Sequence, residues 1–144
     1  RKYLAFAKKA DAEGYPQIAR LFRAAAEAET VHAHAHLRAL KGVGTTLENL
    51  RAAIAGEGHE FREMYPTFIA DAEIEKATAA LISFRNAMAV EKTHHDLYAG
   101  ALASLEGGND LAAEPIHVCQ VCGHTHVGGA PDRCPVCGMT LSRR

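Results

Sequence analysis

The stretch EAETVHAHAHL, residues 27–37, combines helix-forming alanines with a glutamate and histidines at helical spacing. It belongs to a predicted helix that has Pro16 in its first turn and ends at Gly42. Glu29 and His32 fall on the apolar stripe of this helix, on the side that faces inward. A Glu-x-x-His pair places a carboxylate and an imidazole one turn apart on one face. The stretch therefore predicts metal ligands inside a bundle of helices.

Apolar spacing and capping residues predict three more helices. The first covers about residues 2–13 and is ended by Gly14. A helix that begins after Thr45 and Thr46 passes the pair Tyr65–Pro66, where a kink is expected. The last helix covers about residues 72–105. Four helices thus fill the first part of the chain.

Acidic residues interrupt the apolar stripes of the last two helices as well. Glu57 and Glu60 share one face, and Glu91 is followed by His94 and His95, either of which reaches the same face as Glu91. A single interruption could be a solvated helix face, but glutamates gathered in a low-dielectric space cannot all ionise without a cation. Interruptions on three helices therefore indicate a pair of metal ions, and a carboxylate-rich set favours iron or manganese over zinc or copper.

All four cysteines lie in two Cys-x-x-Cys pairs near the end of the chain: Cys119, Cys122, Cys134 and Cys137. Each pair is followed by a glycine, as in the tight turns that surround a tetrahedral metal site. In a chain with no secretory signal, this spacing favours metal thiolates over disulfides. The spacing does not separate an iron site from a structural zinc ribbon, so both interpretations stay open.

Composition limits the remaining possibilities. The 144-residue chain has 16 basic and 17 acidic residues, which excludes the basic surface typical of nucleic-acid or membrane binding. It has no apolar run long enough to cross a bilayer, so a cytoplasmic location is expected.

Glycine, proline and cysteine become frequent after residue 105. The predicted domains are therefore a bundle at residues 1–105, a linker at 106–115 and a four-cysteine domain at 116–144.

The motifs FAKKADAEGYPQIARLF, EAETVHAHAHL, NLRAAIAGEGHEFREMYPTF, AVEKTHH and CPVCG, in this order, resemble the rubrerythrin family. The resemblance implies an all-α fold, with a ferritin-like four-helix bundle that holds two non-haem iron ions and a small rubredoxin-like domain that holds one iron, or zinc. It implies that His32 replaces Glu60 as a ligand when the irons are reduced, and that Tyr65 lies beside them. The iron ligands that it implies in the bundle are Glu29, Glu57, Glu60, Glu91 and His94, and those in the tail are Cys119, Cys122, Cys134 and Cys137.

One expected ligand falls outside the sequence. The first helix of the family contributes a further glutamate about two turns, or about seven residues, before the position of Tyr3. That position precedes Arg1, and Glu13 near the other end of the helix cannot replace it. We expect the missing glutamate to precede the given sequence, and not to have been lost.

The connection between the second and third helices is short for a ferritin-like bundle. Those two helices run parallel there, so their connection crosses the bundle, about 35 to 40 Å. Residues 42–46 reach only about 17 Å. We therefore expect a homodimer in which the first two helices of one chain pack with the last two of another.

The resemblance and the residues together predict a peroxidase that reduces hydrogen peroxide to water in oxidative-stress defence. Electrons would come from a donor protein, such as a rubredoxin or its reductase, through the four-cysteine iron. Two alternatives are an iron-handling protein with a structural zinc ribbon and a non-catalytic interaction module stabilised by metal.

Overall fold

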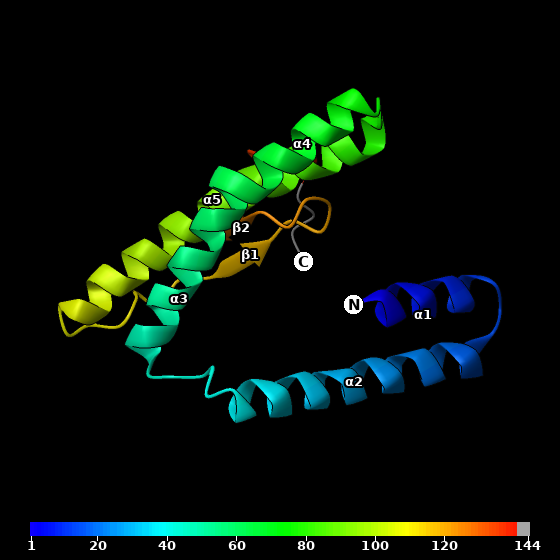
Figure 1. Cartoon of the computed structure of the whole chain (residues 1–144), viewed down its shortest axis with the longest axis horizontal. Helices are drawn as coiled ribbons and strands as arrows, with labels where there is room; N and C mark the ends of the chain where they lie inside the picture. The colour runs from blue at the N-terminus through cyan, green and yellow to red at the C-terminus, as the bar shows by residue number, and fades with distance from the viewer. Residues whose placement is uncertain (141–144) are drawn as a thin grey trace. The chain divides into compact units, whose positions relative to one another are not determined.

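A computed structural model describes residues 1–140 as a mostly helical chain with a small C-terminal domain (Figure 1). The chain divides into two compact units, residues 1–44 and the part from residue 45 onward. The predicted fold class, a helical protein with a rubredoxin-like tail, is confirmed. Positions 141–144 of the predicted tail domain lie outside the described residues. Within the described part, no helix is long and apolar enough to cross a bilayer.

The first unit is a helical hairpin of α1 (Lys2–Ala12) and α2 (Pro16–Ala39). Its core consists of small side chains, Ala7, Ala10 and Ala19, which let the two helix backbones approach closely. Phe22 packs against this core, and its ring centroid lies 5.5 Å from that of Phe6. Pro16 occupies the first turn of α2, as predicted.

The end of α2 differs slightly from the prediction. The helix ends at Ala39, and Lys41 adopts a left-handed conformation with φ 53°. The N–H of Gly42 donates to the carbonyl of Leu37 at 2.9 Å, and that of Lys41 to Arg38 at 2.9 Å. This pair of bonds is a Schellman motif, in which a lysine takes the position that glycine usually holds.

The second unit packs a broken helix antiparallel to a long one. The broken helix consists of α3 (Thr46–His59), the π-helix η1 (Glu60–Met64) and α4 (Tyr65–Ile74), and the long helix is α5 (Thr78–Glu106). Thr45 caps α3 in a capping box with Glu48, which confirms the predicted start. Ion pairs lie at both ends of this antiparallel pair, Arg51 with Glu106 and Arg85 with Glu73, each at 2.8 Å.

The predicted start of the last helix was wrong. Ala72 is buried near the end of α4, and α5 begins only at Thr78. The chain turns at Lys76, which has φ 55°, and the N–H of Ala77 donates to the carbonyl of Ala72 at 2.9 Å. No glycine or proline marks this turn, so the sequence lacked a stop signal there.

The tail forms a small domain around a two-stranded antiparallel sheet. Its strands are β1 (Ile116–Val118) and β2 (Thr125–Val127), and His117 lies opposite His126. A second turn, Cys134 to Gly138, is closed by a bridge between Arg133 and Thr140. Strand β2 contacts α5, so the tail and the long helix belong to one unit (Figure 1).

Candidate metal centres

Glu57 on α3 meets Glu91 and His94 on α5 in a partly buried cluster. One ligand atom from each of these residues lies within 4.8 Å of the others. The His94 Nδ1 atom lies 2.8 Å from Glu91 Oε2 and 3.7 Å from Glu57 Oε1. Gly58, next to Glu57, is buried, and a Cβ atom there would lie 3.4 Å from the ring of His95, so α3 packs closely against α5 at this level. The structure thus brings together three of the predicted ligands from two helices.

The glutamates of this cluster disfavour the ionised form of one another. The pKa of Glu57 is raised, first by loss of hydration and then by the charge of Glu91. His94 partly offsets this effect, and Glu60 adds to it. Partly buried glutamates that face one another are the donor set that a hard cation such as iron or manganese stabilises. The residues present therefore fit the metal site that the sequence predicted.

The kink predicted at Tyr65–Pro66 takes the form of the π-helix η1. The N–H of Tyr65 donates to the carbonyl of Glu60, five residues back, and Pro66 has no N–H to continue an α-helical ladder. The wider turn lies between Glu57 and Tyr65 and changes which residues share a face. A local irregularity of this kind is frequent at functional sites.

Tyr65 lies within the electrostatic field of the cluster. Its pKa is raised, first by burial and then by the charges of Glu91, Glu60 and Glu57. The ring packs against Phe68 and Phe84, with centroid distances of 6.1 and 6.2 Å. The phenol is therefore held in its neutral form next to the glutamates.

The structure distinguishes between the two histidines that the sequence left as alternative metal ligands. His94 faces Glu91 and Glu57, whereas His95 packs edge-on against the ring of Phe61 at 5.4 Å and lies 3.2 Å from Asp96. These contacts favour His94 as the ligand.

Glu29 and His32 belong to the first unit. There the His32 Nδ1 atom lies 3.5 Å from Glu29 Oε2, and both side chains are exposed within the single chain. Their predicted roles in the bundle site stay predictions.

The four cysteines converge in the tail. The Sγ atoms of Cys119 and Cys137 lie 3.7 Å apart, and those of Cys122 and Cys134 lie 3.5 Å apart. A tetrahedral metal with bonds of about 2.3 Å to sulfur places its ligands about 3.8 Å apart. The cysteines form no disulfide, and they fit a four-cysteine iron or zinc site.

Backbone N–H groups point to the sulfurs of the two turns. Burial alone would raise the pKa of the Cys119 thiol, but the N–H groups of Cys122 and Val121 and the neighbouring thiols lower it to about 7. Burial raises the pKa of the Cys122 thiol to about 12. Gly123 and Gly138, with φ 85° and 72°, allow the sharp reversal after each pair. The turn therefore stabilises one thiolate directly, whereas the proton of Cys122 has to be displaced by the metal.

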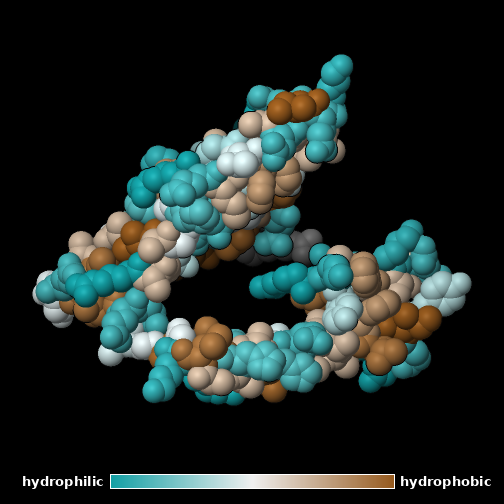
Figure 2. Space-filling model, viewed as in Figure 1, coloured by the Kyte–Doolittle hydropathy of each residue, from teal (hydrophilic) through white to brown (hydrophobic). Residues whose placement is uncertain are grey.

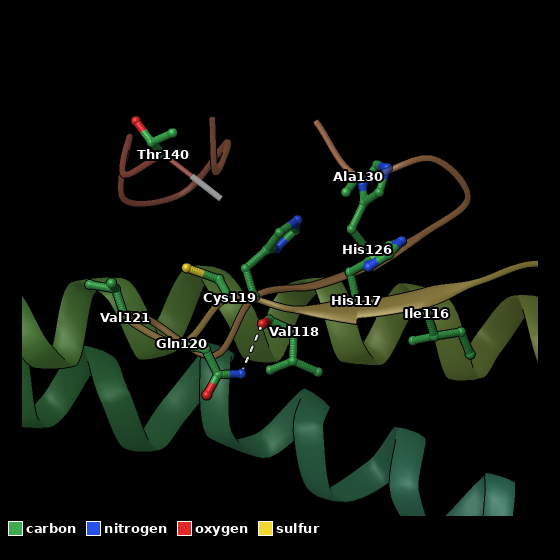
Figure 3. A pocket seen from close by; sticks show the side chains of 10 residues that line it. Ile116, His117, Val118, Cys119, Gln120, Val121, His126, Ala130 and Thr140 are labelled. Atoms are coloured by element: carbon green, nitrogen blue, oxygen red, sulfur yellow. Dashed lines mark hydrogen bonds between the residues drawn. The ribbon is translucent and has the colours of Figure 1, made fainter. Parts of the chain in front are cut away.

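A cavity of about 590 Å³ lies beside β1 and Cys119, lined in part by His117, His124 and His126 (Figure 3). His124 is buried, and within the described residues its Nδ1 atom has no hydrogen-bond partner. Burial, then His126 and His94, lowers the pKa of His124. The neutral form of this buried imidazole is therefore favoured.

Thr125 makes a contact with the cluster that the sequence does not predict. The hydroxyl of Thr125 on β2 lies 2.9 Å from His94 Nε2, across 31 positions of the chain. A threonine in a short strand gives no signal of such a contact, because only the packing of β2 against α5 creates it.

A glutamate and histidine cluster between helices, followed by a four-cysteine domain, defines a class of helical metalloproteins with two kinds of metal site. Comparison with known proteins agrees: the family model described as Rubrerythrin matches residues 1–102, and that described as Rubrerythrin, rubredoxin-like domain matches residues 117–143. The chain belongs to the rubrerythrin family, as the sequence motifs predicted.

Individual relatives match along most of their length. Rubrerythrin of Porphyromonas gingivalis is 36% identical over 152 residues, which cover 94% of this chain and 76% of that protein. Rubrerythrin-2 of Clostridium acetobutylicum is 32% identical over 152 residues, with 96% and 83% covered. The solved structure of nigerythrin in its partially reduced state is similar with a TM-score of 0.61 and 32% identity, covering 96% of this chain and 74% of that one.

Proposed function

We propose that this protein is a peroxidase that reduces hydrogen peroxide to water in oxidative-stress defence. The observation that carries the proposal is that one unit holds two unlike donor sets, the Glu57, Glu91 and His94 cluster and the four cysteines. The solved structures of nigerythrin include a mixed-valent state and a fully reduced, all-ferrous state, which supports redox-active iron in this family.

The side chains around the cluster have separate tasks. When bound, iron would supply the redox chemistry, with two electrons from the bundle pair to break the O–O bond and single electrons from the cysteine site to replace them. Tyr65, whose pKa is raised, keeps its proton and can donate a hydrogen bond to a peroxide oxygen. Glu57, Glu91 and His94 would hold the metal, which would compensate the carboxylate charge that the raised pKa of Glu57 shows to be disfavoured without it. Glu60 and His32 would exchange as ligands between redox states.

The expected electron donor is a protein such as a rubredoxin or its reductase. Val118 and Val121 flank Cys119, and both side chains are exposed (Figure 3). An apolar surface next to a thiolate metal suits a brief contact with a donor of similar polarity. We infer that the donor binds on this side of the tail.

The proposal is tested by a single anaerobic turnover. The protein is reduced, one equivalent of hydrogen peroxide is added, and the visible thiolate-to-iron absorption of the cysteine site is followed. Rapid return of the colour is expected, because the bundle takes its replacement electrons from that site. A colourless oxidised protein would mean a zinc ribbon, and slow return of the colour would favour iron handling over peroxidase activity.

We also propose that two chains complete each site as a swapped homodimer. The 24 residues of α2 span about 36 Å, whereas the six residues 40–45 between α2 and α3 reach at most about 22 Å. The α1–α2 hairpin leaves Ile18, Leu21 and Val31 exposed, and apolar surface is visible along it (Figure 2). Burial of this surface against a second copy would drive the exchange.

Mixing of two inactive variants tests the exchange. Chains with Glu29→Ala are unfolded and refolded together with chains that carry Glu57→Ala, and metal content and peroxide turnover are measured. About half of the refolded dimers contain one chain of each variant. In a swapped mixed dimer, one of the two sites has both Glu29 and Glu57, so metal content and turnover should return to about one quarter of the wild-type values. If each site lies within one chain, the mixture stays as inactive as the separate variants.

A further inference from the structure

Thr125 connects the tail to the glutamate cluster. It lies on β2 opposite Val118, and its hydroxyl lies 2.9 Å from the Nε2 atom of His94 on α5. The other ring nitrogen, Nδ1, lies 2.8 Å from Glu91 Oε2. Both nitrogens of the His94 imidazole are therefore engaged, one by the tail and one by the cluster.

A hydroxyl is well suited to this position because it can either donate or accept a hydrogen bond. Without metal, Nδ1–H of His94 can donate to Glu91 while Nε2 accepts from the Thr125 hydroxyl. If His94 bound a metal through the nitrogen that faces the glutamates, the remaining ring proton would lie on Nε2, and the same hydroxyl would accept a hydrogen bond from it. The ring need not turn between the two states, so Thr125 can hold one orientation in both.

We propose that Thr125 is a positioning residue, which holds His94 with Nδ1 toward the glutamates and joins this ligand to the cysteine site. The link to the cysteine site is a second hydrogen bond, in which the N–H of Cys119 donates to the carbonyl of His124 at 2.8 Å. His124 directly precedes Thr125 in the chain. Two hydrogen bonds and one short stretch of backbone thus connect Cys119 with His94.

The electron-transfer part of this inference rests on the proposed function. With iron bound at both sites, the connection would carry one electron at a time, lost at the cysteine site and gained at the glutamate site. No atom or proton has to cross between the sites. The positioning part does not depend on turnover, so the two parts can fail separately.

The positioning part is tested by cobalt binding to the bundle in protein whose cysteine site is already loaded with iron. Thr125→Val keeps the shape but lacks the hydroxyl, and Thr125→Ser keeps the hydroxyl. Loss of a residue that orients a ligand typically weakens metal binding about 10- to 100-fold. We expect such a loss in Thr125→Val, a changed visible spectrum of the bound cobalt, and recovery in Thr125→Ser.

A matched control is Thr93→Val on α5. The hydroxyl of Thr93 donates to the backbone carbonyl of Ala89 in its own helix, at 3.2 Å, so this change should leave cobalt affinity and spectrum as in the wild type. Wild-type cobalt affinity and spectrum in Thr125→Val would overturn the positioning role.

The joining role is tested by the return of colour after one equivalent of peroxide. We expect Thr125→Val, with its bundle fully loaded with iron at raised iron concentration, to recolour several-fold more slowly than Thr125→Ser and Thr93→Val. Equal rates would overturn the joining role while the proposed function stands. If the wild type itself does not recolour, the proposed function fails, and cobalt binding still decides the positioning role.

Discussion

Glu57→Ala should empty the glutamate site of metal and abolish peroxide turnover. Glu57 is the predicted ligand from α3, and it is the one residue of α3 in the cluster of three that it forms with Glu91 and His94. Loss of a direct ligand should cost more than the roughly 10- to 100-fold that follows loss of a residue supporting one. Metal analysis after dialysis and steady-state peroxide consumption check both effects. Iron content equal to that of the wild type would remove Glu57 from the site.

A suitable control lies in η1, a short distance along the same helix. The Glu63 side chain is 72% exposed and lies 3.3 Å from the exposed His59, so Glu63→Ala removes a carboxylate without touching the cluster. It should leave metal content and turnover unchanged. A similar loss in both variants would point to disturbance of the helix instead of loss of a ligand.

Removal of the Glu57 charge should stabilise the metal-free protein, although it should weaken metal binding. The pKa of Glu57 is raised in the folded chain, so the folded state holds this proton more tightly than the unfolded state does. This contribution to stability is fully present below the unfolded pKa of about 4.3 and is lost as the pH rises through the folded value. Metal-free Glu57→Gln should therefore be more stable than the wild type at neutral pH, as measured by urea unfolding, and the difference should shrink at about pH 4.

The helices and much of the glutamate cluster could be predicted because their signals are local. A spacing of three residues places Glu91 and His94 on one face of any helix. Thr45, with Glu48 three residues later, marks a helix start in the same way. In the tail, the positions of four cysteines in two short turns are enough to predict a tetrahedral site.

Other features depend on contacts between distant parts of the chain, and a local pattern does not encode them. The preference for His94 over His95 depends on the packing of α5 against α3 and η1, which places His95 against Phe61 of η1. The contact of Thr125 with His94 arises only when β2 packs on α5. The turn at Lys76 was missed for another reason, since a lysine there adopts a conformation that usually marks glycine.

Cys122→Ser should abolish turnover that is driven by an external reductant, yet leave one oxidation of the reduced bundle by peroxide intact. The Sγ atom of Cys122 lies 3.5 Å from that of Cys134, so serine removes one corner of the tetrahedron. If the cysteine site relays electrons as proposed, the bundle site keeps its ligands and its first pair of electrons but loses the route by which they would be replaced. Steady-state peroxide consumption and a single anaerobic oxidation measure the two steps separately.

Loss of turnover in Cys122→Ser has a second possible cause, because a small domain without its metal can unfold. Wild-type protein with zinc at the cysteines separates the two causes, since zinc keeps the tetrahedral fold and has no redox chemistry. If the site relays electrons, the zinc protein is as inactive in steady state as Cys122→Ser while its single oxidation stays normal. If the tail is only structural, the zinc protein turns over at the full rate, and the relay is excluded. The zinc protein therefore decides between an electron-transfer site and a structural ribbon, which the spacing of the cysteines leaves open.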